Sequence, residues 1–381
     1  MTLSIYLDYN ASTPLDERVL ETMIIAYRNY YGNADSRTHD FGIKARKEVE
    51  LSRERVASLL NISKNEVVFT SGATESDNLA ILGLADYGHE TGKRHIITTA
   101  IEHKAVLEPI KALEKRGFLV DYVYPDDSGR IDTDLLLNKV RPDTLLVSVM
   151  HANNETGIIQ PVKEIGDALY NSPTFFHIDA AQSCGKLVEE LKGIRYDLLS
   201  LTAHKMYGPQ GIGALILRVK NYKRPPIKPI AYGGGHEGGL RPGTLPVALI
   251  VGLGKACELA EKEFNSRLEQ YRLSKKDIID ELNNSGVAYA VNGDPKYCIP
   301  NTLNVSFLGI DSEALMIATK QFCSVSNGSA CTSHDYSHSH VLTAMGLSEA
   351  RIESAIRISW GKDINIQNLS KMFEEIKHLT N

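Results

Sequence analysis

Cysteine is scarce in this chain of 381 residues. There are five cysteines, and no two of them form a Cys-x-x-Cys pair. An odd number this small does not suit a disulfide framework, and the missing pairs argue against a four-cysteine zinc site. The five are Cys184, Cys257, Cys298, Cys323 and Cys331. We therefore expect a reducing, cytoplasmic location, with each cysteine either packed as a small hydrophobe or reactive.

Several functional signals are also missing. No apolar run approaches the roughly 18 residues that span a bilayer, and Met1–Asp8 lacks the regions of a secretory signal. Neither a Walker A pattern nor a GxGxxG after a strand occurs. The net charge of −5 lacks the basic excess of a dedicated DNA-binding protein. We expect no membrane partner, no direct nucleic-acid binding and no Rossmann nucleotide site.

Short apolar strands alternate with amphipathic helices through the middle of the chain. The expected strands are 66–70, 95–99, 119–124, 144–150, 174–178, 198–201 and 213–217. This alternation predicts an α/β fold with a mostly parallel sheet that helices cover on both faces. Thr13 and Pro14 have the residue types of a helix cap and a first helical position, which predicts a helix starting there.

The pattern changes after about residue 245. Two long helical stretches, 246–263 and 266–284, precede a shorter alternation of strands and helices that ends near residue 379. We expect a large domain over residues 14–258. A smaller α+β domain would combine residues 1–13 with residues 259–381.

Three polar features lie where strands end. Ser71–Thr74 forms a turn between a strand and a helix, where free N–H groups can bind an anion. Asp179 ends one expected strand and Lys205 follows another, a pair that pyridoxal 5'-phosphate (PLP) chemistry needs. By local sequence alone, an ordinary capped turn explains Ser71–Thr74 better than an anion site does, and two unrelated polar residues explain Asp179 and Lys205 equally well.

Longer segments carry a resemblance to a known family. They are Tyr6-Leu7-Asp8, 70–78, 102–106, 151–157, 177–183, 203–209, 241–246, 328–331 and Arg357-Ile358-Ser359. Together the chain resembles the NifS/IscS-like cysteine desulfurases of the class V aminotransferase group. The resemblance implies the fold of fold-type-I PLP-dependent transferases, with a large PLP-binding domain and a small domain that carries a catalytic cysteine.

The resemblance also implies a PLP site. Lys205 would hold the cofactor covalently, and His103 would stack on its ring and assist proton transfer. The remaining cofactor contacts would come from Ala73, Thr74, Asn154, Asp179, Gln182, Thr202, His204 and Thr244. Because the family's equivalent of Thr244 reaches the phosphate of a neighbouring subunit, we expect a homodimer with shared active sites.

For the substrate, the resemblance implies L-cysteine. Arg357 would grip its carboxylate, with Asn33 and Asn154 nearby, and Lys205 would remove the α-proton. Cys331, in a run of small polar residues, would take the sulfur as a persulfide and leave L-alanine. The long spacing from Cys331 to Val341 resembles that of the long-loop branch of the family, which implies that the persulfide is delivered directly to acceptor proteins.

The acceptors would serve iron–sulfur clusters, thiolated nucleic acid or DNA phosphorothioation. The sequence Arg241–Leu245 and the short C-terminal end are similar to those of desulfurases in DNA phosphorothioation systems. Histidines follow Cys331 at 334, 338 and 340. We expect no metal site there, and protonated histidines could lower the pKa of the thiol.

Two alternatives stay open. Another PLP enzyme of this fold, such as a selenocysteine lyase or an aminotransferase, would not need Cys331 for turnover. A non-catalytic scaffold of a sulfur-relay complex would need neither Lys205 nor Cys331.

Overall fold

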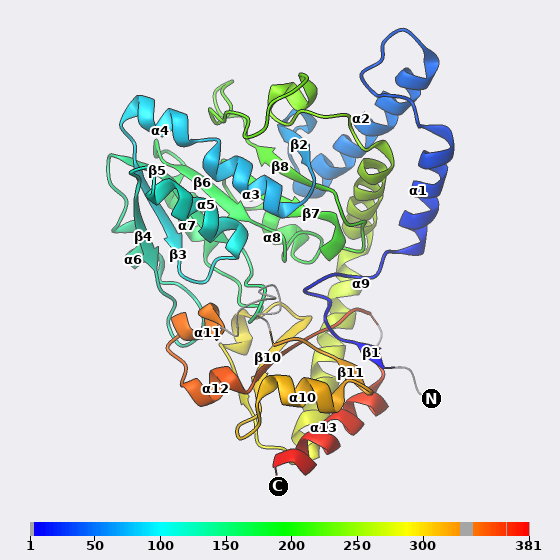
Figure 1. The fold of residues 1–381 in the computed structure, drawn as a ribbon, viewed down its shortest axis with the longest axis vertical. Helices are drawn as coiled ribbons and strands as arrows, with labels where there is room; N and C mark the ends of the chain where they lie inside the picture. Colours follow the sequence, from blue (N-terminus) through cyan, green and yellow to red (C-terminus); the bar gives the residue numbers. More distant parts are fainter. Residues whose placement is uncertain (1–3, 328–337, 363, 381) are drawn as a thin grey trace.

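The computed structural model describes residues 4–327, 338–362 and 364–380, which contain a larger sheet, a smaller sheet and a separate pair of short strands (Figure 1). The larger sheet has seven strands in the order β2-β8-β7-β6-β5-β3-β4. They are β2 (Val67–Thr70), β3 (His95–Thr99), β4 (Leu119–Val123), β5 (Thr144–Met150), β6 (Phe175–Asp179), β7 (Leu198–Thr202) and β8 (Gly213–Leu217). Within this sheet β8 runs antiparallel to both of its neighbours, and the other pairs are parallel. All seven expected strands are present, so the predicted mostly parallel sheet is confirmed.

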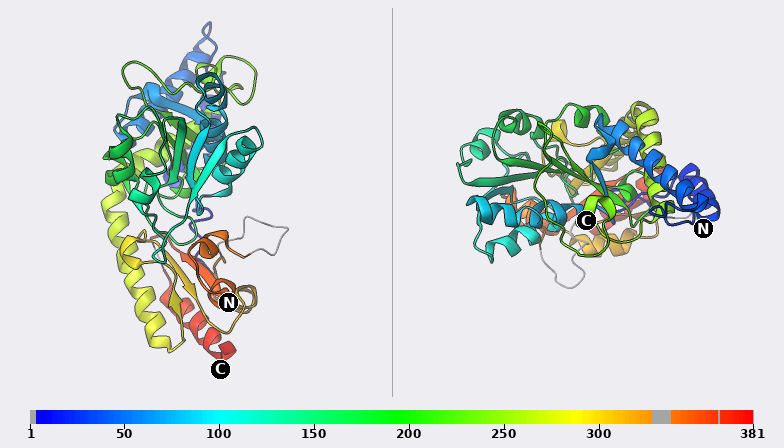
Figure 2. Two further views of the ribbon diagram at one scale, coloured as in Figure 1. Left: turned by 90° about the vertical axis from the view of Figure 1, so that its left-hand side faces the viewer. Right: turned by 90° about the horizontal axis from the view of Figure 1, so that it is seen from above.

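Helices cover both faces of the larger sheet (Figure 2). Along β8, Ala214 and Ile216 pack into one hydrophobic core, while Leu215 and Leu217 pack into a second. This is the two-residue alternation of a strand that is buried on both faces. The first core includes helices α1 (Glu17–Asn29), α2 (Asp40–Leu60), α6 (Thr133–Leu137), α7 (Val162–Leu169) and α8 (Val188–Lys192); the second includes α3 (Ala73–Leu82), α4 (Ala85–Thr91) and α5 (Lys104–Glu114).

The smaller sheet is antiparallel. Its central strand β10 (Thr302–Ser306) pairs with β12 (Ala355–Ser359) and β9 (Ala290–Val291). Beside it, β1 (Ile5–Tyr6) pairs in parallel with β11 (Cys323–Ser324), so the N-terminal segment lies with residues from the other end of the chain. Because of this pairing, Leu7 packs with Trp360 in the hydrophobic core of the smaller sheet. The accompanying helices are α10 (Ser312–Thr319), α11 (His340–Ala344), α12 (Glu349–Glu353) and α13 (Ile366–Thr380).

One helix, α9 (Val247–Ser285), replaces the two helices expected over 246–263 and 266–284. The expectation of a break was wrong because residues 263–266 contain neither glycine nor proline, and Glu263 is paired with Arg267 one turn later at 2.9 Å. The first half of α9 packs in the core of the larger sheet, and Tyr271, Ile278 and Leu282 pack in that of the smaller one. The predicted domain boundary at residue 258 falls inside this helix, and the division into 14–258 and 1–13 with 259–381 stays a prediction.

The expected helix start at Thr13 and Pro14 was also wrong. α1 begins at Glu17, and the side chain of Asp16 caps it by accepting the N–H of Arg18. The Thr13 hydroxyl is used elsewhere, because it donates to the carbonyl of His204 at 2.9 Å and accepts the N–H of Tyr207 at 2.8 Å. These bonds tie the N-terminal segment to the end of β7. Among the described residues, no helix combines the length and apolar character that crossing a membrane requires.

Candidate active site

A cavity of about 540 Å³ lies at the carboxyl ends of β5, β6 and β7. Met150, Asp179 and Thr202, the last residues of these strands, all line it. Ten residues predicted from the sequence meet there: Ala73, Thr74, His103, Asn154, Asp179, Gln182, Thr202, His204, Lys205 and Arg357. Parallel sheets bind ligands at this edge because loops from several strands converge on it.

The N-terminus of α3 provides backbone donors on one side of the cavity. Gly72 precedes the helix with φ of 155°, a conformation that favours glycine, and no side chain caps the first turn. A Cβ on Gly213 would lie 2.7 Å from the Gly72 Cα, so β8 also needs glycine for this close approach. The N–H groups of Ala73 and Thr74 therefore face the cavity at the positive end of the helix dipole.

Two aspartates, Asp77 of α3 and Asp179 at the end of β6, lie close together at the cavity. Burial, reinforced by Asp179, raises the pKa of Asp77 well above its usual range, and neither Asp77 oxygen has a hydrogen-bond partner among the described residues. The carboxyl group of Asp179 accepts the N–H of Ala181 at 2.8 Å. Burial also lowers the pKa of His177 to about 3, so this ring is neutral between Ser148 and Ser200. Both aspartates line the cavity, and Asp179 is the one that the sequence predicted to contact a ligand.

The segment after β7 brings Lys205 to the same cavity. A short 3-10 helix, Ala203–Lys205, turns the chain immediately after Thr202. Burial, with a smaller effect from Lys205, lowers the pKa of His204 to about 4, so His204 is neutral at pH 7. Two bonds from Thr13 to the His204 carbonyl hold this turn in place.

His103 lines the cavity and caps α5. Its Nδ1 accepts the N–H of Ala105 at 3.1 Å at the start of α5. Burial lowers the pKa of His103, which favours the neutral ring. Because Nδ1 is an acceptor, the proton of the neutral ring lies on Nε2.

Arg357 reaches the cavity from the smaller sheet. Its Nη1 donates to the Asn154 carbonyl at 2.8 Å, and its Nη2 pairs with Asp8 at 2.5 Å. Its Nε is buried and has no hydrogen-bond partner among the described residues. A buried donor without a partner is costly, so the guanidinium has capacity for a further acceptor such as a carboxylate.

Comparison with known proteins assigns the chain to a family. The sequence model of the class-V aminotransferases matches residues 5–372. The cysteine desulfurase IscS of Anaeromyxobacter dehalogenans is 46% identical over 364 residues, 95% of this chain and 89% of that protein. The chain belongs to the class-V aminotransferase family. Its relatives place it in the IscS/NifS-like group, as the sequence predicted.

Solved structures of this family agree with the fold. A NifS-like protein superposes with a TM-score of 0.90 at 38% identity, over 99% of both chains. DndA from Streptomyces lividans superposes with a TM-score of 0.81 at 44% identity, over 94% of this chain and 99% of that one. The chain is therefore a fold-type-I enzyme of this family, and these enzymes are PLP-dependent as a class.

The cavity of this family member fits PLP. The uncapped amides of Ala73 and Thr74 suit a phosphate group, and an acid at the position of Asp179 suits a pyridine nitrogen. Lys205 lines the same cavity and supplies the amine that PLP enzymes need. The donor set thus matches the phosphate, the ring and the aldehyde of the cofactor.

Three predicted residues do not join this cavity among the described parts of the chain. Asn33 is exposed and its side chain accepts the N–H of Asp35 at 2.9 Å, as a turn residue does. Thr244 is exposed after Gly243, whose φ is 109°. Cys331 lies outside the described residues. The roles of these three stay predictions.

The other cysteines behave as packing residues. Cys184, Cys257 and Cys323 are buried, and burial raises the pKa of Cys184 and of Cys323 to about 12. The Cys298 thiol lies within 3.2–3.4 Å of three carbonyl oxygens, and burial raises its pKa as well. None of these four is a thiolate at neutral pH, which leaves Cys331 as the candidate nucleophile.

The sequence did not single out Asn10, Asp77 or Lys186, although all three belong to or border the site. Asn10 and Asp77 line the cavity, and Lys186 contacts Gln182, which also lines it. Asp77 lies one helical turn after Ala73, and Lys186 lies four residues after Gln182. These spacings were the available signal, but they are common in ordinary helices and turns.

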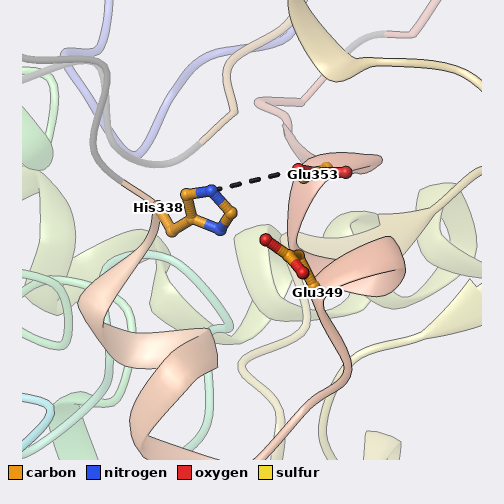
Figure 3. A group of neighbouring side chains, drawn as sticks. All are labelled: His338, Glu349 and Glu353. Atoms are coloured by element: carbon orange, nitrogen blue, oxygen red, sulfur yellow. Dashed lines mark ion pairs between the residues drawn. The ribbon is translucent and has the colours of Figure 1, made fainter.

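A separate group of side chains includes one histidine of the histidine-rich segment (Figure 3). His338 points toward Glu349 and Glu353 of α12, with 4.0 Å between His338 Nε2 and Glu353. All three are exposed, and exposed acidic groups of this kind are common without an ion. The expectation of no metal site is neither supported nor contradicted by this group.

Proposed function

We propose that this protein is a cysteine desulfurase that uses PLP to remove sulfur from L-cysteine. The products are L-alanine and a persulfide on Cys331. The observation that carries the proposal is the convergence of Lys205, Asp179, His103, the α3 amides and Arg357 on one cavity.

Different residues of the chain would bind different parts of the cofactor. The amides of Ala73 and Thr74, with Thr202 and His204, would bind the phosphate, and Asp179 would pair with the ring nitrogen. His103 would stack on the pyridine ring. When bound, PLP supplies an electron sink for the electrons that remain when the α-proton leaves.

Arg357 and Lys205 would act on the substrate. The free donor capacity of Arg357 binds the cysteine carboxylate, with Asn154 beside it, and this fixes the α-proton toward Lys205. Lys205 takes that proton as a general base. His103, whose Nε2 carries the proton, can pass a proton within the cavity.

Cys331 would receive the sulfur. Its thiolate attacks the substrate sulfur, so an S–S bond forms as the C–S bond breaks, and the carbon side keeps the electron pair. Protonation of that carbon, together with return of the α-proton from Lys205, gives alanine. An acceptor thiol would then take the outer sulfur from the persulfide by thiol exchange, within the reducing cytoplasm.

We infer that the enzyme acts as a homodimer. Ile25, Tyr27, Tyr31, Phe41 and Ile43 are each at least half exposed on and between α1 and α2. Such an apolar surface supports a protein contact. In such a dimer, the family resemblance gives Thr244 a role at the neighbouring site. An Ile25→Glu variant should shift to monomer in light scattering, whereas Leu135→Glu, on exposed α6, should not.

The test of the proposed function uses purified protein, PLP and L-cysteine. The wild type should form alanine and, with a thiol reductant, sulfide. Lys205→Ala should lose both products and the visible absorbance of bound PLP. Cys331→Ala should keep that absorbance and lose sulfide. Full sulfide release by Cys331→Ala would favour a selenocysteine lyase or an aminotransferase, and a wild type without any turnover would favour a scaffold.

A further inference from the structure

Lys186 is a buried lysine beside the cavity that the proposed reaction does not use. The residue is 6% exposed, and it lies in the segment between β6 and α8. Its Nζ is 3.3 Å from Asn10 Oδ1 and 3.2 Å from Gln182 Oε1. In the described parts of the chain, no carboxylate forms an ion pair with it. A buried cation whose only partners are neutral amides is costly, so a compensating charge is expected nearby.

The surroundings of Lys186 are positive. Burial first, and then the charges of Lys205 and Arg357, lower the pKa of Lys186 to about 7. These two cations face Lys186 from the turn after β7 and from β12. With a pKa near 7, Lys186 is only partly protonated at neutral pH, and Asp77 and Asp179 line the cavity together with Lys205 and Arg357. An anionic group bound next to Lys186 would favour its protonated form.

Lys186 also determines how two amides are oriented. An ammonium group can only donate, so the side-chain oxygens of Gln182 and Asn10 must face it. Gln182 Nε2 then donates to the Asn10 carbonyl at 2.8 Å, and Asn10 Nδ2 donates to Thr302 Oγ1 at 2.9 Å. Since Gln182 lines the cavity, the group that it keeps for a ligand is its N–H.

We propose that Lys186 is a positioning residue of the cofactor site, which holds Gln182 as a donor to a bound anion and adds a buried positive charge beside it. The anion would be the phenolic oxygen of the pyridoxal ring, so the inference rests on the proposed function. Lys186 does not touch the cofactor in this account; it acts through Gln182 and through its charge.

The test compares Lys186→Met, which removes the donor and the charge, with Lys186→Arg, which keeps both. Cofactor-stripped protein is titrated with PLP, and the visible absorbance of the loaded protein is followed against pH. Lys186→Met should weaken PLP binding by about tenfold, the loss of one hydrogen bond to a charged group. Lys186→Arg should stay near the wild type.

The pH midpoint of the absorbance gives a second readout that a purely structural role would not move. A nearby cation disfavours protonation of the nitrogen on Lys205, so its removal should raise this midpoint by about half a unit or more. Lys276→Met, an exposed lysine on α9, serves as the control and should change neither quantity.

A folded Lys186→Met protein with wild-type PLP affinity and midpoint would overturn the proposal. If that variant does not fold, Lys186→Gln decides, because it removes the charge but keeps a polar donor. Its midpoint must rise, and an unchanged midpoint refutes the role of the charge. A wild type that shows no visible absorbance with PLP would refute the proposed function itself, whatever the lysine variants do.

Discussion

Glu102 should make the protein lose stability as the pH rises, and replacing it with glutamine should remove that loss. Its side chain is fully buried next to His103. Oε1 accepts the Thr99 hydroxyl at 2.6 Å and the Met150 N–H at 2.9 Å, while Oε2 has no partner among the described residues. Burial, which outweighs the effect of these two bonds, raises the pKa of Glu102 from 4.5 to about 8. The carboxyl group is therefore mostly protonated at pH 7.

The magnitude follows from linkage between protonation and folding. Because the folded pKa is raised, the folded chain binds more protons, and stability falls as the pH rises from the unfolded pKa near 4.5 through the folded pKa near 8. Each pKa unit corresponds to about 1.4 kcal/mol. Between pH 5 and pH 8 the loss from Glu102 amounts to at most about 3.5 kcal/mol.

Urea unfolding followed by circular dichroism at several pH values between 5 and 8 measures this loss. The free energy of unfolding of the wild type should fall relative to that of Glu102→Gln across this range, because glutamine does not titrate. If the new amide destabilises the protein by a constant amount, the free energy of unfolding falls equally at every pH. The pH dependence of the difference from the wild type is then unaffected. Glu90→Gln, at an exposed carboxylate on α4, should parallel the wild type. A difference between Glu102→Gln and the wild type that is independent of pH would refute the reasoning.

Three further predictions concern other parts of the structure. Ser339→Ala should lower the free energy of unfolding, measured by urea titration, by about 2 kcal/mol, because the Ser339 hydroxyl donates to the buried Glu155 carboxyl group at 2.5 Å. Ser339→Thr keeps the hydroxyl and should lower the free energy of unfolding by less. Gly254→Ala should cost about 1–3 kcal/mol, because its Cβ would lie 2.7 Å from Ser52 of α2, and an unchanged urea midpoint would contradict this close packing. Arg357→Lys should raise the KM for L-cysteine by about tenfold or more with a smaller effect on kcat, because lysine cannot donate the two parallel hydrogen bonds of a guanidinium group. A change confined to kcat would argue against binding of the substrate carboxylate by Arg357.

The larger sheet could be predicted from the sequence because its strands are short, apolar and bounded by polar turns. Thr144–Met150 and Gly213–Leu217 match β5 and β8 residue for residue. The continuity of α9 could not be predicted in the same way. The sequence near Glu263 contains no helix breaker and so allows a continuous helix, but it does not require one; packing against both cores keeps the helix continuous along its length.

Some residues of the candidate site could also be predicted from the sequence, and others could not. Residues at strand ends and helix starts, such as Asp179 and Ala73, could be placed from the sequence because topology brings them to one edge. The contact of Lys186 with Asn10 joins residues 176 positions apart, and no local pattern reports it. The same holds for Arg357 and Asp8, which are 349 positions apart.

Mass spectrometry of the Cys331 peptide after one turnover with isotopically labelled L-cysteine tests the central claim most directly. The account predicts that the wild-type peptide gains the mass of one labelled sulfur atom, and that Lys205→Ala, treated identically, gains none. Labelled sulfide formed by wild-type protein with no sulfur ever found on Cys331, together with full turnover by Cys331→Ala, would contradict it.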